Sequence, residues 1–318
     1  PMYWTPLTQY MMWNQFTAEG TLKYQFIETV TKIVPMYALR GFGGLLYVSG
    51  IFLLVYNIVK TAKKGNFLAE EEAFAAPLPK TMPKVAKEHW HTWIERRPVQ
   101  MLVFALIAVA IGGIVEMVPT FLVKSNIPTI TSVKPYTPLE LHGRNIYIRE
   151  GCYTCHSQMI RPFRHEVARY GDYSKAGEFV YDHPYQWGSK RTGPDLARLG
   201  GKYPDSWHYN HMLIPEAMTA GSIMPAYPWL FTDRIDKTKT PDIINAMTRL
   251  GVPYPKGYDA IANDDLEKQA RQIKESLAKD KISVQTTDEI VALIAYLQRL
   301  GTDIKKDNRD SLNMAVPN

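Results

Sequence analysis

Two long apolar runs interrupt an otherwise polar chain. In residues 35–59 only Arg40 and Asn57 break the apolar pattern, and in residues 98–123 Glu116 is the one charged side chain. A helix of roughly 20 apolar residues is long enough to cross the hydrocarbon core of a bilayer. We therefore predict two transmembrane helices in contact with membrane lipid. Arg40 and Glu116 lie towards the helix ends, where each either marks a functional site or reaches the lipid–water interface.

The segment between the two runs, residues 62–97, is polar and basic. Within it, residues 66–88 combine an acidic run with scattered Pro and Ala, as a linker does. Positive side chains concentrate in the cytoplasmic loops of membrane proteins. We therefore expect this linker to be cytoplasmic and both outer ends to face the opposite side, which is the periplasm of a Gram-negative cell. The basic residues in and beside the linker are Lys60, Lys63, Lys64, Lys80, Lys84, Lys87, Arg96 and Arg97.

After the second run the pattern becomes that of a helical soluble domain. Residues 124–138 contain three prolines, which predicts an extended tether. Apolar positions at helical spacing follow in residues 139–151, 263–279 and 287–300, and no stretch reads as a convincing sheet. The fold class we predict is therefore mainly α, with a domain over residues 139–318.

The last of these helices has the clearest limits. Thr287 and Asp288 are of the types that cap the start of a helix, and Gly301 is of the type that ends one. The apolar face between them contains Ile290, Val291, Leu293, Ile294, Leu297 and Leu300.

The formal charge of +6 could suggest a nucleic acid partner. No stretch, however, combines clustered Lys and Arg with the aromatic side chains on which bases stack. Membrane-flanking lysines and a basic soluble surface account for the charge. Nucleic acid is therefore excluded as a partner.

The only cysteines are Cys152 and Cys155, and His156 follows directly. In a C-x-x-C-H sequence two thiols can add to the vinyl groups of a haem while the histidine reaches the iron. A thioredoxin-like dithiol would sit beside a βαβ pattern, and a zinc site would need further Cys or His at regular spacing. Neither context occurs, so we predict one covalent haem c with His156 as an axial ligand.

Met224 is the predicted second axial ligand. A thioether raises the haem potential relative to a second imidazole, and Pro225 holds residues 222–227 extended. Met159 is too near His156 in sequence to reach the opposite haem face. The alternative for Met224 is an ordinary core position. Other candidate ligands are Met212, Met218, His165, His183, His208 and His211.

Residues 192–196 form a rigid Thr-Gly-Pro-Asp-Leu turn between these two ligands. The turn can aim the Pro194 carbonyl at the free ring nitrogen of His156. Such a bond would fix the imidazole orientation and raise its basicity. The alternative is a turn with no role at the haem.

The residues around the haem motif resemble a known family. GCYTCHSQMIRPFRHE (151–166) and RYGDYSKAGEFVYDHPYQWGSKRTGPDLARLGGKY (169–203) are similar to the monohaem cytochrome subunit of C-family (cbb-type) haem–copper cytochrome c oxidases. The resemblance extends over about residues 98–231, and His156 and Met224 match the family's axial ligands. Residues 232–285 look like an extension without an assignment.

Residues 1–61 resemble the C-terminal end of the catalytic subunit of the same oxidase, including its last transmembrane helix. No signal peptide is recognisable at the start. We therefore expect a fused polypeptide that begins within a longer chain. The b-type haems, the copper and their ligands would then lie outside this sequence.

The resemblance implies both an architecture and a function. Two transmembrane helices would carry a periplasmic, class I-like c-type cytochrome domain at the bacterial inner membrane, with a closing helix that crosses the one before the haem motif. Electrons from a soluble cytochrome c or a dihaem cytochrome c subunit would pass through this haem to the b-type haems of the catalytic subunit. Oxygen would be reduced to water there, with proton pumping.

The resemblance also implies two further contacts with the catalytic subunit. Ser189 matches a serine that helps bind calcium near the haem propionates of that subunit. Arg161 is expected to face the same propionates as a fixed positive charge.

Three other functions remain open at this point. A stand-alone membrane cytochrome would shuttle electrons without an oxidase around it, which the first 61 residues argue against. A thiol–disulfide oxidoreductase would use Cys152 and Cys155 and would need neither haem nor Met224. A haem-based sensor would need an output domain that the sequence does not suggest.

Overall fold

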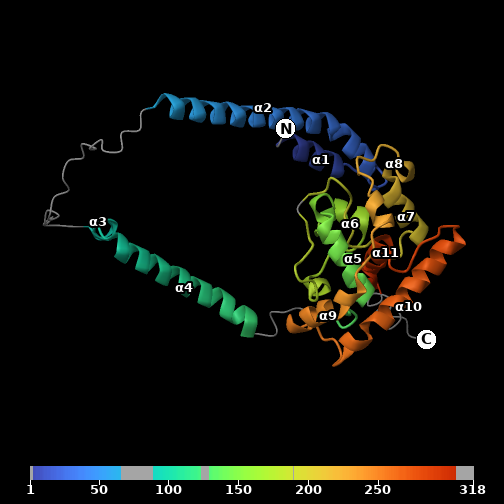
Figure 1. Ribbon diagram of the computed structural model, residues 1–318. Coiled ribbons are helices and arrows are strands. Elements are labelled where there is room, and N and C mark those ends of the chain that lie inside the picture. Colours follow the sequence, from blue (N-terminus) through green and yellow to red (C-terminus); the bar gives the residue numbers. More distant parts are fainter. Residues whose placement is uncertain (1–2, 66–88, 123–128, 189, 306–318) are drawn as a thin grey trace. The chain divides into compact units, whose positions relative to one another are not determined.

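The structure is a computed structural model, shown in Figure 1. It describes residues 3–65, 89–122, 129–188 and 190–305. Within these ranges the chain is helical, and the isolated bridges Phe16–Leu22 and Arg234–Asp288 are the only strand-like pairings. The chain divides into two compact units, residues 1–40 with 128–318 and residues 41–127. The prediction of a mainly α fold is confirmed.

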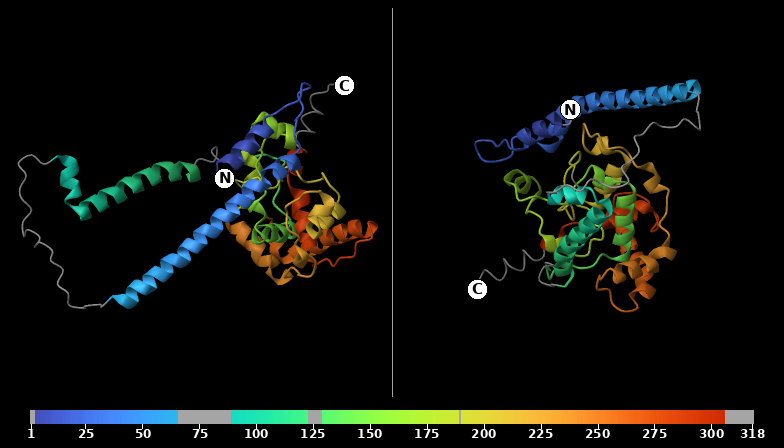
Figure 2. Two further views of the ribbon diagram at one scale, coloured as in Figure 1. Left: turned by 90° about the horizontal axis from the view of Figure 1, so that it is seen from above. Right: turned by 90° about the vertical axis from the view of Figure 1, so that its left-hand side faces the viewer.

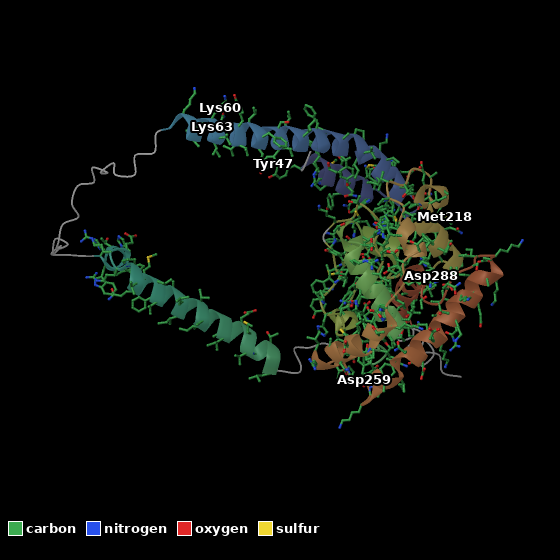
Figure 3. The ribbon with its side chains drawn as sticks, viewed as in Figure 1. Tyr47, Lys60, Lys63, Met218, Asp259 and Asp288 are labelled. Carbon is green, nitrogen blue, oxygen red and sulfur yellow. The ribbon has the colours of Figure 1, made fainter. Side chains whose placement is uncertain are left out.

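Two helices in the structure are long and apolar enough to cross a membrane, α2 (Phe26–Lys64) and α4 (Pro98–Leu122). The helix α2 begins earlier than predicted, because residues 26–34 also form helix and bury Val30 and Ile33. Pro35 therefore lies inside the helix rather than at its start. Lys60 and Lys63 lie at the far end of α2 from these buried residues (Figure 3). The predicted linker of residues 66–88 lies outside the described residues.

The core of the cytochrome domain is the crossing of α5 (Pro138–Arg149) and α11 (Glu289–Arg299). Thr137 and Glu140 form a capping box that begins α5. Gly143 lets the two backbones approach closely, because an added Cβ would lie 2.0 Å from the carbonyl oxygen of Ala292. The expected crossing of the closing helix and the helix before the haem motif is confirmed.

The start of α11 differs from the prediction in one detail. Asp288 occupies the N-cap position, but its side chain makes no cap hydrogen bond to the helix. Its carboxylate instead accepts a hydrogen bond from the backbone N–H of Gln285, at 2.7 Å. Gly301 follows the helix in the left-handed conformation (φ +71°), as a helix-ending glycine does.

The unassigned extension, residues 232–285, is an integral part of this domain. Its helices are α9 (Thr240–Arg249) and α10 (Tyr258–Lys279), and Figure 2 shows them against the rest of the domain. Leu266 and Leu277 of α10 join the main core, while Ile244 of α9 belongs to a second cluster with Leu141 of α5. The extension therefore completes the burial of α5.

The N-terminal helix α1 (Trp4–Trp13) and the first part of α2 pack on the same unit through aromatic side chains. Trp13 stacks on Phe26 and on His165 of α6 (Arg164–Tyr170), with ring centroids 6.1 and 6.2 Å apart. Arg169 of α6 donates a hydrogen bond to the Tyr24 carbonyl at 2.9 Å. Residues 3–40 are thereby attached to the cytochrome domain.

The remaining short helices of the described residues are α3 (Trp90–Glu95), α7 (Asp205–Leu213), α8 (Pro215–Met218), η2 (Cys152–Thr154), η3 (Ala176–Phe179), η4 (Pro228–Phe231) and η5 (Lys237–Lys239).

A methyl group at Gly143 should force α5 and α11 apart. We expect Gly143→Ala to lower the free energy of unfolding by about 1–3 kcal/mol, the usual cost of overpacking a core. Asn145→Ala, at an exposed position of the same helix, is the matched control and should change stability by less than about 0.5 kcal/mol. Thermal unfolding of the purified chain, followed by circular dichroism, measures both. Equal stability of the two variants would contradict the close crossing.

Candidate functional site

The C-x-x-C-H motif begins where α5 ends. Gly151 adopts a left-handed conformation (φ +69°) that turns the chain out of the helix and into the short helix η2. Cys152 is half-buried, Cys155 is exposed, and both thiols are free. The His156 backbone N–H donates to the Cys152 carbonyl at 2.9 Å, which closes the motif into a compact loop.

Burial raises the pKa of the Cys152 thiol to about 12, and the Glu150 charge adds to this shift. Catalytic thiols have a lowered pKa, because the thiolate is the nucleophile. The environment of Cys152 is therefore not that of an activated thiol.

The His156 ring is held by the turn that contains Pro194. The ring Nδ1 lies 2.8 Å from the Pro194 carbonyl oxygen, and only Nδ1 can be the donor in this pair. The hydrogen bond therefore leaves Nε2 unprotonated and able to coordinate a metal. Burial lowers the pKa of His156, although the Pro194 carbonyl opposes this shift, so the neutral ring is favoured.

Gly193 leaves room for the ring of His156 in this position. A Cβ there would lie 2.3 Å from Cε1 and 2.7 Å from Nδ1 of His156. A neutral imidazole with a free Nε2, next to two free thiols, has the donor set that a covalently bound haem requires. The residues of this site therefore fit a haem c.

Met224 lies in a loop without regular secondary structure that follows α8. Its side chain is half-buried and packs against the same core as Cys152. Its backbone N–H donates to Ser222 Oγ at 3.2 Å, and the Tyr227 N–H donates to the Met212 carbonyl at 3.0 Å. The second of these hydrogen bonds holds the loop against α7. Met212 itself is buried in the main core, as a packing residue would be.

The alternative histidine ligands have separate surroundings. His165 stacks on Trp13 and on Phe163. His208 and His211 lie on α7, and within the described residues neither ring nitrogen of His208 has a hydrogen-bond partner. Burial lowers the pKa of His211 to about 4, with a smaller effect from His156. The helix α7 therefore brings His211 within electrostatic range of His156.

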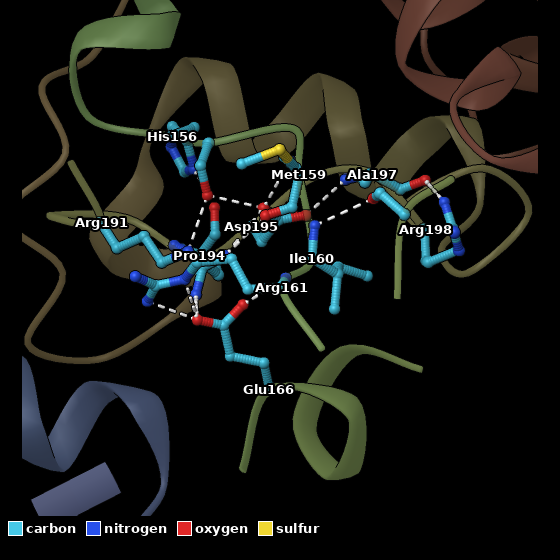
Figure 4. Close-up of polar contacts among 12 residues, drawn as sticks. His156, Met159, Ile160, Arg161, Glu166, Arg191, Pro194, Asp195, Ala197 and Arg198 are labelled. Atoms are coloured by element: carbon cyan, nitrogen blue, oxygen red, sulfur yellow. Dashed lines mark hydrogen bonds and ion pairs between the residues drawn. The ribbon is translucent and has the colours of Figure 1, made fainter. Parts of the chain in front are cut away.

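A buried polar network surrounds the His156 loop, and sequence reasoning missed it. Figure 4 shows Arg191 with Glu166 and Asp195 beside His156 and Pro194. The Asp195 carboxylate accepts hydrogen bonds from Ser157 Oγ (2.6 Å) and from the Met159 backbone N–H (2.9 Å). The sequence does contain one indication of this network, because Arg191 and Asp195 flank the Thr-Gly-Pro turn with opposite charges.

Only one of the two residues expected to contact the catalytic subunit lies within the described residues. Arg161 lies with its guanidinium against Glu166, where Nε is 2.5 Å from Oε1, and its side chain is 46% exposed. Burial raises the pKa of Glu166, but hydrogen bonds from Arg191 and Arg161 outweigh it and the net pKa is lowered. Ser189 lies outside the described residues, and the described residues hold no cluster of three or more His, Cys, Asp or Glu suited to a metal ion.

A side chain at Gly193 should displace the His156 ring. We expect Gly193→Ala to reduce the yield of correctly ligated haem about tenfold, the lower end of the range for altered support of a metal ligand. Thr192→Ala, which removes atoms from the same turn, is the control and should leave the yield unchanged. Haem staining on denaturing gels, with absorption spectra of the native chain, measures both. A normal yield in Gly193→Ala would show that the ring does not depend on this space.

Two kinds of similarity to known proteins bear on this site. Residues 91–304 match the family described as "Cytochrome C oxidase, mono-heme subunit/FixO", and the match includes the extension 232–285. The chain also resembles proteins named as subunit 1 of cytochrome c oxidase, over shorter stretches. It is 32% identical over 74 residues to a cytochrome c oxidase subunit 1 homolog of Azorhizobium caulinodans (23% of this chain, 13% of that protein).

Two further relatives have similar names and similar coverage. The chain is 38% identical over 65 residues to the bacteroid subunit 1 homolog of Bradyrhizobium diazoefficiens (20% of this chain, 12% of that protein). It is 38% identical over 63 residues to cytochrome c oxidase subunit 1 of Rhodobacter capsulatus (20% and 12%). The chain thus spans a small fraction of the length of each of these relatives. Since the family match covers most of the chain, the protein belongs to the mono-haem FixO family of cytochrome c oxidase subunits, and it also contains a stretch similar to subunit 1.

Proposed function

We propose that this chain delivers electrons within a cbb-type cytochrome c oxidase. It accepts them from a soluble cytochrome c or a dihaem cytochrome c subunit and passes them to the b-type haems of the catalytic subunit, where oxygen is reduced to water. The observation that carries this proposal is the 2.8 Å contact of His156 Nδ1 with the Pro194 carbonyl, directly after two free cysteines. Membership of the mono-haem family supports one haem c per chain.

Four side chains hold the haem in this proposal. Cys152 and Cys155 form the thioether bonds, and His156 and Met224 are the axial ligands. The bound haem supplies one-electron chemistry between ferric and ferrous iron. Pro194 keeps the proton on Nδ1 of His156, so that Nε2 would be free to bind the haem iron and would gain basicity.

The basic residues at the ends of the two membrane helices support one topology of the chain in the membrane. Lys60, Lys63 and Lys64 end α2, and Arg96 and Arg97 precede α4, which favours a cytoplasmic location for the segment between them. The cytochrome domain then lies in the periplasm at the inner membrane. The b-type haems and the copper site are proposed to lie in the part of the oxidase outside this sequence.

Two contacts with the catalytic subunit complete the proposal. Arg161 is half-exposed beside Glu166, so its guanidinium remains accessible to a haem propionate of the neighbouring subunit. Ser189 is proposed to contribute to a calcium site near the same propionates.

A stand-alone membrane cytochrome is the alternative that uses the same haem site. The similarity to subunit 1 favours the oxidase, because a shuttle would have no need of such a stretch. The two functions differ in whether the haem is reoxidised by oxygen within one complex.

The haem ligands can be tested by spectroscopy. We expect wild type to retain haem on a denaturing gel at one haem per chain, as measured by the pyridine haemochrome. Met224→Ala should keep the covalent haem but lose the sulfur-to-iron absorption band and have a lower potential. Met218→Ala, in the nearby helix α8, is the matched control and should keep the band. Absence of covalent haem in wild type would reject the cytochrome function.

The proposed role of this chain within the oxidase can be tested by measuring oxygen consumption. We expect the isolated chain with its haem to be reduced by a cytochrome c donor but to consume no oxygen at a catalytic rate. In the purified complete oxidase, the same haem should be reoxidised on addition of oxygen, and cyanide should block this. Reoxidation that occurs in membranes but is lost in the purified complex would favour the stand-alone shuttle.

A further inference from the structure

The proposed axial ligand His156 lies between two segments of the chain that are not helical. One is the loop that runs from His156 to Met159, and the other is the turn that contains Pro194. The Asp195 carboxylate joins them, because it accepts from Ser157 Oγ at 2.6 Å and from the Met159 N–H at 2.9 Å. Asp195 directly follows Pro194 in the chain, so these bonds also hold the Pro194 carbonyl towards His156.

Arg191 ties the same two segments together from the other side. Its Nε donates to Ser157 Oγ at 2.8 Å, and its terminal nitrogen donates to the Met159 carbonyl at 2.7 Å and lies 3.3 Å from Asp195. The other terminal nitrogen lies 2.5 Å from Glu166 Oε1 on α6. One guanidinium thus contacts both halves of the His156 site and an external helix (Figure 4).

The burial of this network makes its geometry rigid. The Arg191 side chain is 7% exposed, and those of Glu166 and Asp195 are 1% and 0% exposed. A buried charge without its partner is strongly unfavourable, so these three groups stabilise one arrangement. A planar guanidinium with fixed donor directions suits this task, and a lysine with a single point charge cannot make the same set of bonds.

We propose that Arg191 is a positioning residue for the axial ligand. It holds Ser157, Met159 and Asp195 so that the Pro194 carbonyl stays aligned with Nδ1 of His156. A well-aligned hydrogen bond makes the imidazole a stronger donor, which stabilises ferric iron and lowers the reduction potential. Because it concerns the haem ligand, this role rests on the proposed function.

The test compares Arg191→Lys with Arg198→Lys in membranes that contain the whole oxidase. Arg198 is also a buried arginine, paired with Glu178 at 2.7 Å with both side chains 8% exposed, but it makes no bond to the His156 loop. Both variants keep the positive charge. A difference between the two variants therefore reports the alignment of His156. It cannot come from a lost charge or from the loss of a buried arginine as such.

We expect Arg191→Lys to shift the redox equilibrium of the haem about tenfold towards the ferrous form, which is a rise of about 59 mV for one electron. The low-spin ferric electron paramagnetic resonance signal should also change, since it reports the orientation of the axial ligands. Arg198→Lys should leave potential and signal at their wild-type values. Equal potentials and signals in wild type and Arg191→Lys would overturn the proposal.

A second variant covers the case in which Arg191→Lys fails to assemble. Glu166→Asp keeps the negative charge but draws the carboxylate back from Arg191 on α6, and it should raise the potential in the same direction. An unchanged potential in Glu166→Asp would then overturn the role of Arg191. Failure of the proposed function has a different signature, namely no covalent haem in wild type or a haem that oxygen does not reoxidise.

Discussion

The close crossing of α5 and α11 at Gly143 determines where both halves of the His156 site can lie. The end of α5 leads directly into Gly151 and Cys152, so the angle of this helix sets the start of the haem motif. The end of α11 supports the other half, because the Leu300 carbonyl accepts from the Gly200 N–H at 2.9 Å. Gly301 packs against Ala197, where an added Cβ would lie 2.2 Å from the carbonyl oxygen. Two helices far apart in sequence thus align His156 with the Pro194 turn.

The contacts inside this crossing are aromatic and polar as well as aliphatic. Tyr147 of α5 and Tyr296 of α11 lie with ring centroids 5.4 Å apart, and both are fully buried. The Tyr296 hydroxyl is 3.1 Å from the Gln158 amide oxygen, just after the haem motif. A hydrogen bond therefore connects α11 to the loop that follows the C-x-x-C-H motif. This bond specifies the register of the loop in a way that apolar packing alone does not.

The sequence predicts those parts of the molecule that depend on local pattern. The apolar runs, the C-x-x-C-H motif and the closing helix all have strong local signals, and the structure has the corresponding elements. The early start of α2 was missed because residues 26–34 are stabilised by the burial of Val30 and Ile33 in tertiary contacts. The side chain of Asp288 bonds to Gln285 instead of the helix for a similar reason, since the preceding loop offers a competing donor.

The buried network was hardest to anticipate, because charged residues in a sequence usually indicate a solvated surface. Glu166 and Arg191 are 25 positions apart, and only the folded chain shows that they meet beside His156. No motif identifies the extension 232–285, because its helices are ordinary amphipathic helices whose place on α5 follows from packing.

The contact of residues 3–40 with α6 has a consequence for assembly. Gln9 donates to the Arg191 carbonyl at 3.1 Å, and Trp13 stacks on His165, so this contact reaches the edge of the buried network. Separate proteins that form such a contact lose translational and rotational freedom, at a cost of about 4–15 kcal/mol. Within one polypeptide that loss occurs once, at synthesis, and the contact becomes independent of protein concentration. A cytochrome attached in this way keeps a fixed one-to-one stoichiometry with the segment it contacts, even when the protein is dilute in the membrane.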